Sequence, residues 1–461
     1  MTTGTARPRE HARAARASSS RERVLGLRAR HALAAALVTA VALALGAGGC
    51  AREKAPLKVA IIGIDGMDWQ LAEPLIEAGR MPNVKRIIDG GMRADLRSLG
   101  EGMKSPVIWA SIATGKGWNK HGVLDFVVGD EEQHLVGSES WRARPVWDIL
   151  GENGLTVGIV NWLVTWPALR VNGYSVADRV AFAPEDGNAP IPDLTWPPEL
   201  ADEFGPLRQP ATRTTNDQIA RFLNGPAWQT TRSPEVGLAV EAFRMTWAED
   251  QTVLQVATHL LDTREQPDLF AVYFEGLDLN CHRHWGQMDP SSVDVAESEE
   301  LVETFRDVIP RYYERMDGIV GELVEHLDED TTVIICSDHG FRGPVRTTQG
   351  MLLGVYMHRQ IGVFAAKGPR IRKGTDALDL DVLDIAPTLL ALFGIPVARD
   401  MDGFVANDVI DPGYLKRHPV TFVDTYEAPR AEAPGDTGGG ASSSPVDEAV
   451  KERLRSVGYI E

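Results

Sequence analysis

Three long apolar runs along the chain each end in an acidic turn. The first is KVAIIGIDGMD, which begins at Lys58, and the same order returns in PDLFAVYFEGLDLNCH from Pro267 and in TTVIICSDHGF from Thr331. A continuous apolar run of this kind is typical of a parallel strand that is buried on both faces. The sequence therefore predicts three core strands, each followed by polar side chains at its carboxyl end.

Helical periodicity occupies the intervals between these runs. Apolar residues recur at helical spacing within residues 69–88, 236–261 and 300–327. Strands that alternate with helices favour the α/β class, with a mainly parallel sheet that carries helices on both faces. Because ligands of such sheets bind beyond the carboxyl ends of the strands, the three acidic turns are expected to share one edge of the sheet.

The alternation is interrupted in about residues 126–249. This stretch is rich in proline and tryptophan, and its tryptophans are Trp141, Trp147, Trp162, Trp166, Trp196, Trp228 and Trp247. We interpret part of it as an inserted cap region over the sheet edge, which would shape a substrate pocket. Packing of the tryptophans in the core is the alternative explanation.

Composition divides the chain into further parts. The 461 residues are 43% hydrophobic and 24% charged, which is typical of a folded globular protein and excludes disorder throughout. We expect the main domain in residues 50–425. A flexible linker rich in Gly, Ser and Pro is expected in residues 426–445, followed by a short helix in residues 446–461 that Gly458 ends.

Residues 1–49 have the properties of a signal peptide for export. Eight arginines and two glutamates are followed by residues 32–49, which carry no charge. The segment ends in LGAGGC and so resembles the lipobox of bacterial lipoproteins, in which cleavage leaves the cysteine, here Cys50, as an acylated N-terminus. The resemblance implies an exported lipoprotein, anchored to a bacterial membrane on the periplasmic or cell-surface side. An uncleaved membrane anchor is the alternative, since about 18 apolar residues is the lower limit for a span.

The rest of the protein is strongly acidic. The eight arginines and two glutamates give the leader a charge of +6, so the formal charge of −18 for the whole chain leaves −24 for residues 50–461. Such an acidic body is a poor partner for a nucleic-acid polymer or for an anionic membrane surface. Besides Cys50 the sequence contains only Cys281 and Cys336, which we expect to be buried thiols.

The polar residues that follow the three apolar runs are of the types that bind divalent metals. They are Asp65, Asp278, His282, Asp338, His339 and, beside a later short run, His358. Imidazole nitrogen and carboxylate oxygen are zinc ligands, and these residues suffice for two ions with three protein ligands each. Each residue alone also has a structural explanation as a turn, a helix cap or a hydrogen-bonded side chain. Their joint occurrence favours a metal site.

A serine lies between the first two runs, in MKSPVIWASIATGK from Met103. Ser105 directly precedes Pro106 and the apolar residues of a short predicted helix. A serine at this place can cap the helix, because its oxygen accepts a hydrogen bond from an unpaired backbone N–H. Beside a metal ion and a helix N-terminus it can also act as a nucleophile, since both favour its alkoxide.

Together these motifs resemble the alkaline phosphatase superfamily and, within it, the type I phosphodiesterase/nucleotide pyrophosphatase branch, over residues 58–405. In that branch a Thr or Ser nucleophile stands ten residues before the glycine of a TG pair, and an HG pair follows six residues later. Ser105, Gly115 and His121 reproduce these intervals. HRQIGVFAAKGP from His358 is also similar to that branch.

The resemblance implies a role for each residue of the set. One divalent ion would be held by Asp65, Asp338, His339 and Ser105, and the other by Asp278, His282 and His358. Zinc suits this mixture of Asp and His best. The implied activity is two-metal hydrolysis of a phosphate ester, in particular a phosphodiester, through a phosphoserine on Ser105. The substrate would be a small-molecule, lipid or glycan phosphate ester.

Two positions depart from the patterns of this superfamily. Nucleotide pyrophosphatases have an asparagine that binds phosphoryl oxygens where this chain has Phe126, so a preference for nucleotides is not implied. Sulfatases need a proline two residues and an arginine four residues after the modified residue, whereas Pro106 follows Ser105 directly and Trp109 is fourth. The alternatives left open are a phosphomonoesterase, a phosphotransferase or mutase of the same superfamily, and a catalytically silent surface lipoprotein.

If the leader is removed and Cys50 is acylated, the mature protein contains no peptide from residues 1–49. Mass spectrometry of the membrane fraction should then find Cys50 carrying a lipid mass. A Cys50→Ser variant should be released from membranes, because it has lost the lipid that anchors it. Intact leader peptides in the mature protein, or Cys50→Ser protein that remains on membranes, would contradict this prediction.

Overall fold

The computed structural model describes Met1 and residues 57–129, 133–182, 190–231, 233–293, 297–343, 357–374, 379–427 and 444–460. Residues 2–49 of the expected leader, Cys50, and residues 428–443 of the expected linker lie outside the described residues. Residues 57–461 form one compact unit. None of the helices in the described ranges combines the length and the apolar composition that a membrane span requires.

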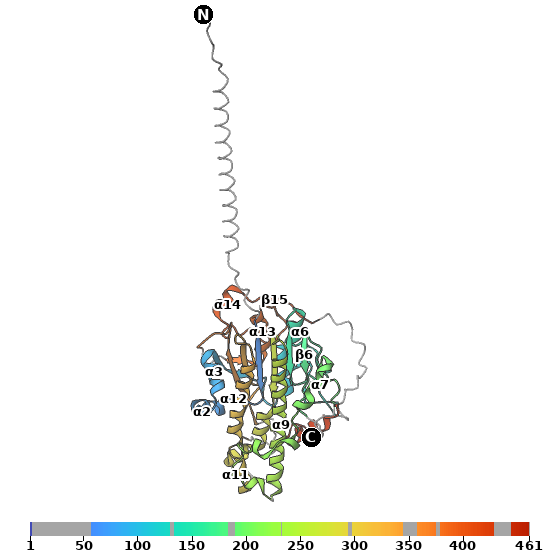
Figure 1. Ribbon diagram of the computed structural model, residues 1–461, viewed down its shortest axis with the longest axis vertical. Helices are drawn as coiled ribbons and strands as arrows, with labels where there is room; N and C mark the ends of the chain where they lie inside the picture. Colours follow the sequence, from blue (N-terminus) through green and yellow to red (C-terminus); the bar gives the residue numbers. More distant parts are fainter. Residues whose placement is uncertain are drawn as a thin grey trace. The chain divides into compact units, whose positions relative to one another are not determined.

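A central sheet organises this unit, and nine strands of the described ranges are hydrogen-bonded within it (Figure 1). Their order across the sheet is β13 (Asp379–Asp381), β2 (Met92–Arg97), β12 (Ile361–Lys367), β9 (Thr332–Cys336), β1 (Val59–Ile64), β8 (Leu269–Phe274), β5 (Val157–Val160), β6 (Gly173–Val176) and β7 (Thr195–Trp196). Pairing is parallel except that β12 is antiparallel to both of its neighbours and β7 is antiparallel to β6. The expected mainly parallel α/β sheet is confirmed.

The three strands predicted from the long apolar runs lie side by side at the centre of the sheet. β1 is parallel to β8 on one side and to β9 on the other, so that Ile62 pairs with Val272 and with Ile335. Neighbouring parallel strands place their carboxyl ends at the same edge of a sheet. The three acidic turns therefore share one edge, as expected.

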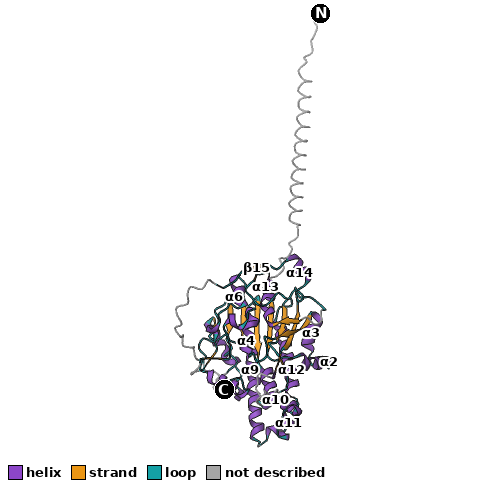
Figure 2. Cartoon of the chain, turned by 180° about the vertical axis from the view of Figure 1, so that it is seen from behind, coloured by secondary structure: helices purple, strands orange, loops and turns teal. Residues whose placement is uncertain are grey.

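Helices cover both faces of the sheet, as Figure 1 and Figure 2 show from opposite sides. One face is covered by α2 (Trp69–Glu77), α3 (Pro82–Gly90), α9 (Pro234–Thr263) and α12 (Val308–His326), and the other by α4 (Ser105–Thr114), α6 (Val146–Glu152) and α13 (Ile385–Phe393). At the carboxyl edge lie α10 (Gly276–Met288) and α11 (Glu299–Phe305). The shorter elements are α5 (Trp118–His121), α7 (Ala201–Phe204), α8 (Asn216–Ile219), α14 (Pro412–Arg417), α15 (Asp447–Ser456), β3 (Val127–Val128), β4 (His134–Leu135), β10 (Gly340–Phe341), β11 (His358–Arg359), β14 (Val397–Ala398) and β15 (Phe422–Val423).

β1 supplies side chains to a hydrophobic core on each face. Ala60, Ile62 and Ile64 belong to the core that contains α9 and α12. Val59 and Ile61 belong to the core that contains α4 and α13. Successive side chains of a strand point to opposite faces, so a strand between two cores must be apolar at every position. The continuous apolar run is therefore the sequence signature of burial on both sides.

The predicted helices are present, two of them with an interruption. Residues 236–261 lie within α9, whereas residues 69–88 form α2 and α3, and residues 300–327 form α11 and α12. The first interruption contains Gly79, whose φ of +73° lies in the left-handed region. Pro82 then begins α3, where its missing N–H leaves no helical hydrogen bond unmade.

About residues 126–249, where an inserted cap is expected, contribute three strands to the central sheet. Because β5, β6 and β7 lie in this stretch, only its remaining segments could form the expected cap. Five of its tryptophans are buried, namely Trp147, Trp162, Trp166, Trp228 and Trp247. Trp147 and Trp162, for example, meet edge to face with ring centroids 5.8 Å apart. Packing in the core accounts for these five side chains.

The C-terminal segment, residues 444–460, packs against the rest of the unit. It contains α15 within the range where a terminal helix is expected, and Gly458 follows the helix with φ of +79°. Val450 and Leu454 are buried in the same core as α9 and α12. Arg453 forms ion pairs with Glu249 at 2.8 Å and with Glu275, just after β8, at 2.7 Å. The segment is thus held at the carboxyl edge of the sheet.

We expect Gly63→Ala to destabilise the protein, because β1 has no room for a side chain at this position. A Cβ atom there would lie 2.7 Å from the ring of Trp109, which is fully buried. Overpacking of this kind costs about 1–3 kcal/mol. Chemical denaturation of the purified protein measures the change in the free energy of unfolding.

Gly318→Ala is the control for this prediction. Gly318 lies within α12, and a Cβ atom added there meets no atom of another element within 4 Å. Alanine is favoured over glycine inside a helix by about 1 kcal/mol. This variant should therefore be at least as stable as the original protein, and equal destabilisation in both variants would refute the packing argument.

Candidate active site

Asp65 reaches the carboxyl edge from a tight turn after β1. Gly66, the next residue, has a φ of +69°, which glycine adopts without strain. A Cβ atom on Gly66 would approach Asp278 to 3.1 Å, so only glycine lets this turn lie close to the first turn of α10. The Asp65 carboxylate is fully buried at this point of contact.

Two aromatic side chains orient the Asp65 carboxylate. Trp109 donates its Nε1–H to Oδ2 at 3.0 Å, and the Tyr273 hydroxyl donates to the same oxygen at 2.6 Å. The other oxygen, Oδ1, lies 3.4 Å from Ser105 Oγ and 3.3 Å from His339 Nε2. One oxygen is therefore fixed by the scaffold, and the other is directed at polar residues of the neighbouring loops.

Ser105 is the first residue of α4, but its hydroxyl does not cap the helix. The N-cap residue is Lys104, which makes no side-chain capping bond, and Pro106 lies in the first turn. The Ser105 hydroxyl is directed at Asp65 instead, and the residue is 2% exposed. The hydroxyl also lies at the positive end of the helix dipole, which favours negative charge on its oxygen.

Asp338 and His339 follow β9 after one intervening residue, Ser337. The backbone N–H of Gly66 lies 3.4 Å from Asp338 Oδ1, which connects the third acidic turn to the first. His339 Nδ1 lies 3.0 Å from the carbonyl oxygen of Gly340. An imidazole that donates from Nδ1 to a carbonyl presents Nε2 as a ligand. Nε2 is 3.4 Å from Asp338 Oδ2 and points into the site.

A second group of ligand-type residues comes from one turn of α10 and from the short strand pair of β10 and β11. Asp278 and His282 are one turn apart in α10 and therefore lie on the same helix face. His358 joins them because β11 pairs with β10, with His358 opposite Phe341. His282 Nε2 lies 3.0 Å from His358 Nε2 and 3.4 Å from Asp278 Oδ1.

Like charges are crowded in this buried site. Burial and the charge of Asp65 raise the pKa of Asp338 well above its usual range. Burial alone would lower the pKa of His339, but the charges of Asp338 and Asp65 raise it to about 10. Burial would raise the pKa of Asp278, but interaction with His282 lowers it. Carboxylates buried this close together require compensating positive charge.

Several ligand-type atoms have no hydrogen-bond partner within the described residues. They are Oδ1 of Asp278, Oδ2 of Asp338 and Nε2 of His339, all buried. Two sets of donor atoms lie within 4.8 Å of one another, Asp278 with His282 and His358, and Asp65 with Asp278 and His339. Buried ligand-type atoms that converge in this way without hydrogen bonds fit a divalent metal ion.

The structure brings together all seven residues that the sequence predicted for this site. Three further contacts were missed, those of Trp109, Tyr273 and Tyr459. Trp109 lies one helical turn after Ser105, so helical spacing pointed to it. The hydroxyl of Tyr459 lies 2.7 Å from Asp278 Oδ2, although 181 residues separate the two in the chain. No local sequence pattern could have indicated that contact.

His121 of the HG pair packs against α4 and has a structural role there. Its Nε2 lies 3.0 Å from Ser111 Oγ, and its Nδ1 accepts from the backbone N–H of Val123 at 3.1 Å. Burial lowers the pKa of His121 to about 4, so the ring is neutral near pH 7. It orders the loop that leaves α4.

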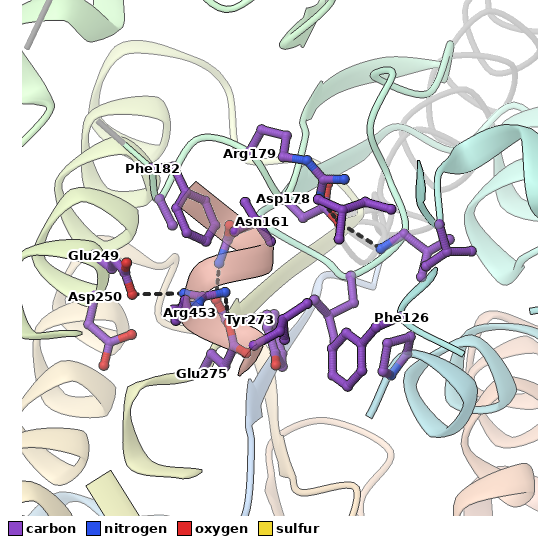
Figure 3. Close-up of a pocket in the computed structure, with 18 residues that line it drawn as sticks. Phe126, Asn161, Asp178, Arg179, Phe182, Glu249, Asp250, Tyr273, Glu275 and Arg453 are labelled. Atoms are coloured by element: carbon purple, nitrogen blue, oxygen red, sulfur yellow. Dashed lines mark hydrogen bonds and ion pairs between the residues drawn. The ribbon is translucent and has the colours of Figure 1, made fainter. Parts of the chain in front are cut away.

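A cavity of about 40 Å³ lies beside the site, bordered by Pro106 and Tyr273 (Figure 3). Arg453 enters it from the C-terminal segment and is paired with Glu249 and Glu275, as Figure 3 shows. Burial raises the pKa of Glu275 to about 8, and the charge of Arg453 opposes that rise. Substrate pockets usually hold roughly 300–1,000 Å³, so this cavity is a buried polar junction behind the site.

Solved structures match this chain at low sequence identity. A 2-O GAG sulfatase has 12% identity and a TM-score of 0.50, over 76% of this chain and 73% of that chain. Human ectonucleotide pyrophosphatase/phosphodiesterase 5 has 15% identity and a TM-score of 0.44, over 77% of this chain and 100% of that chain. Phosphonoacetate hydrolase from Sinorhizobium meliloti has 17% identity and a TM-score of 0.36; the match covers 64% of this chain and spans 59% of the hydrolase. The similarity to the sulfatase shows the fold.

A family match covers the site as well as the fold. No curated protein matches the chain. The model of the family described as type I phosphodiesterase / nucleotide pyrophosphatase, in contrast, matches residues 59–382. This range is more than half of the chain and runs from β1 through β13, so that it contains every ligand-type residue described above. The chain belongs to the type I phosphodiesterase/nucleotide pyrophosphatase family.

Proposed function

We propose that this protein hydrolyses phosphate esters, with Ser105 as the nucleophile. The observation that carries the proposal is the position of the Ser105 hydroxyl, which faces the buried Asp65 carboxylate at the N-terminus of α4. The hydroxyl is not used for capping, and two groups of Asp and His donors converge beside it. A serine in these surroundings is activated by nearby positive charge and by the helix dipole.

The proposed reaction has two steps at phosphorus. Ser105 Oγ forms a bond to phosphorus, the bond from phosphorus to the leaving oxygen breaks, and the leaving group departs with a proton. Water then attacks the phosphoserine, the Oγ–phosphorus bond breaks, a proton from the water returns to Oγ, and phosphate or its remaining ester is released. The Asp and His donors would hold divalent ions, which would stabilise the negative charge that develops on the oxygens during both steps. Asp65 orients the hydroxyl, because its own Oδ2 is held by Trp109 and Tyr273.

We assign the donors to two metal ions as the family pattern suggests. Asp65, Asp338, His339 and Ser105 would hold one ion, and Asp278, His282 and His358 would hold the other. Mixed carboxylate and imidazole donors favour zinc over magnesium, which prefers oxygen ligands and retains its waters. The unpaired buried atoms of Asp278, Asp338 and His339 support this assignment.

We propose that the preferred substrates are phosphodiesters. Enzymes that bind a dianionic monoester need strong positive charge near the nucleophile, and residues 104–119 contain no arginine. The nearby lysines are already paired, Lys104 with Asp125 at 2.7 Å and Lys116 with Asp400 at 2.8 Å. Phe126 adds a buried apolar ring, which stacks on Tyr459 beside the ligand-type residues. A monoanionic diester with an apolar ester arm fits these surroundings better than a dianion.

We also propose that the hydrolysis takes place outside the cytoplasm, on a protein tethered by a lipid at Cys50. This proposal rests on the basic leader and the LGAGGC sequence. The substrate would then be a small-molecule, lipid or glycan phosphate ester available at that side of the membrane.

We expect kcat/KM for bis-p-nitrophenyl phosphate to exceed that for p-nitrophenyl phosphate. We also expect Ser105→Ala to lower the rate with both esters by roughly 10³-fold or more, because the covalent step is lost. Release of p-nitrophenol at saturating zinc measures both effects. A clear preference for the monoester would overturn the diester assignment but not the mechanism.

Ser111→Ala is the control on the same helix. Its hydroxyl is buried and bonded to His121, away from the carboxyl edge. This variant should keep its activity within about tenfold, since it loses a hydrogen bond of modest net value. Activity that survives Ser105→Ala would overturn the nucleophile assignment.

We expect Asp278→Asn to remove one of two bound zinc ions per chain and to abolish hydrolysis. The amide has nearly the same shape as the carboxylate but lacks its charge, so the fold should persist while the ion is lost. Elemental analysis after dialysis gives the metal content, and circular dichroism reports the fold.

Asp317→Asn is the control, because Asp317 is a buried acid that accepts from the backbone N–H groups of Asn83 and Val84 at the start of α3. Its metal content should be unchanged. Activity of the original protein that resists chelators, in a preparation without transition metal, would refute the metal proposal.

A further inference from the structure

The last residues of the chain reach into the second group of ligands. Tyr459 is 3% exposed. Its hydroxyl oxygen lies 2.7 Å from Asp278 Oδ2, 2.8 Å from His282 Nε2 and 3.0 Å from His358 Nε2. Every ligand-type residue of this group is thus in direct contact with a single hydroxyl from the C-terminal segment.

These four groups gather at one point of the site. The imidazole nitrogens of His282 and His358 are 3.0 Å apart, and Oδ1 of Asp278 lies 3.4 Å from one and 3.6 Å from the other. The hydroxyl of Tyr459 contacts both imidazole nitrogens and the other carboxylate oxygen of Asp278, Oδ2. Zinc sites in proteins have four ligands as a rule. The hydroxyl of Tyr459 therefore lies within reach of any ion that Asp278, His282 and His358 would hold.

We propose that the hydroxyl of Tyr459 is an internal fourth ligand at this site and competes there with the phosphoryl group of the substrate. Catalytic zinc sites have three protein ligands and keep the fourth position for water or substrate. Here the chain itself fills that position. The proposal deepens the proposed function, because it names the residue that a phosphoryl oxygen must replace before hydrolysis.

The backbone and ring of Tyr459 are fixed by contacts on both sides. The ring stacks on Phe126 with centroids 4.9 Å apart, and Lys104 Nζ donates to its carbonyl oxygen at 2.9 Å. Its backbone N–H donates to Leu454 O at 2.9 Å, in the turn that Gly458 forms after α15. The turn directs the tyrosine back toward the sheet edge. The contact with the ligands is therefore built into the end of the helix.

α15 is itself anchored by buried ion pairs. Arg453 is paired with Glu249 and Glu275, and Asp447 Oδ1 accepts from Arg179 Nε at 3.1 Å. Breaking a buried pair is costly because it leaves an uncompensated charge. The helix therefore stays in place, and the contacts of the Tyr459 hydroxyl are the ones that a phosphoryl oxygen would have to replace.

The site around Tyr459 is closed to solvent. Ser105 is 2% exposed, and the side chains of Asp278 and His282 are 1% and 2% exposed. A phosphate ester cannot reach Ser105 while these groups are covered. A ligand on a short tether acts at an effective concentration in the millimolar range, so it excludes weak anions and gives way to groups that bind more tightly.

The test compares the full-length protein with Tyr459→Phe, which keeps the ring against Phe126 and removes only the hydroxyl. Competition with a chelator should show that zinc binds more weakly to the variant, by roughly tenfold or more, since lost partners of a metal site cost at least that much. Calorimetry with inorganic phosphate at saturating zinc should show tighter phosphate binding to the variant. Unchanged zinc affinity, or phosphate affinity that is equal or weaker, would overturn the proposal.

Tyr414→Phe is the matched control. Tyr414 is also buried, and its hydroxyl donates to Leu392 O at 3.1 Å, next to α13 and α14. Neither zinc nor phosphate affinity should change in this variant. If the original protein binds zinc and phosphate but hydrolyses no ester, the shifts in Tyr459→Phe still support the internal ligand, and only the proposed function fails. Normal hydrolysis without any shift in Tyr459→Phe refutes the internal ligand and leaves the proposed function standing.

Discussion

Three carboxylates are buried side by side at the carboxyl edge of the sheet, and much of the surrounding structure follows from the cost of placing them there. Asp65, Asp278 and Asp338 are each at most 1% exposed. A carboxylate removed from water without a partner costs several kcal/mol, and like charges nearby add to that cost. The histidines beside them supply part of the compensation. Divalent cations would supply the rest, which is why unpaired donor atoms converge there.

The same constraint requires that the loops be held together, because mutual repulsion would otherwise separate them. Asp68, in the first acidic turn, accepts from the backbone N–H of Phe341 at 3.0 Å and from Arg359 Nη1 at 2.6 Å. Ser337, before the third acidic turn, accepts from the backbone N–H of Met67 at 2.8 Å. These bonds fix the distances between the loops in advance. A site whose ligands are held in this way needs little reorganisation when a charged ligand arrives.

The sequence predicts those parts of the molecule that depend on local residue patterns, such as burial of a strand on both faces. β1, β8 and β9 are predictable because burial on both faces makes every position apolar, and the metal ligands because only a few residue types can serve. β5, β6 and β7 are two to four residues long and too short to show a period, so the sequence does not predict these strands. Tyr459 was missed for a different reason. Its contact with Asp278 spans 181 residues, and only the packing of α15 brings them together.

The C-terminal segment gives the site partners when no substrate is bound. The neutral hydroxyl of Tyr459 adds a further contact to the carboxylate and to both imidazoles, which also contact one another. A phosphoryl oxygen that replaces it carries negative charge, and charged groups bind to cations and to hydrogen-bond donors about twice as strongly as neutral ones. Replacement of the Tyr459 hydroxyl is therefore unfavourable for water and for neutral molecules. It is favourable for anions that reach both groups of ligands at once. Selectivity for phosphate esters would then arise from competition between an internal neutral ligand and an external charged one.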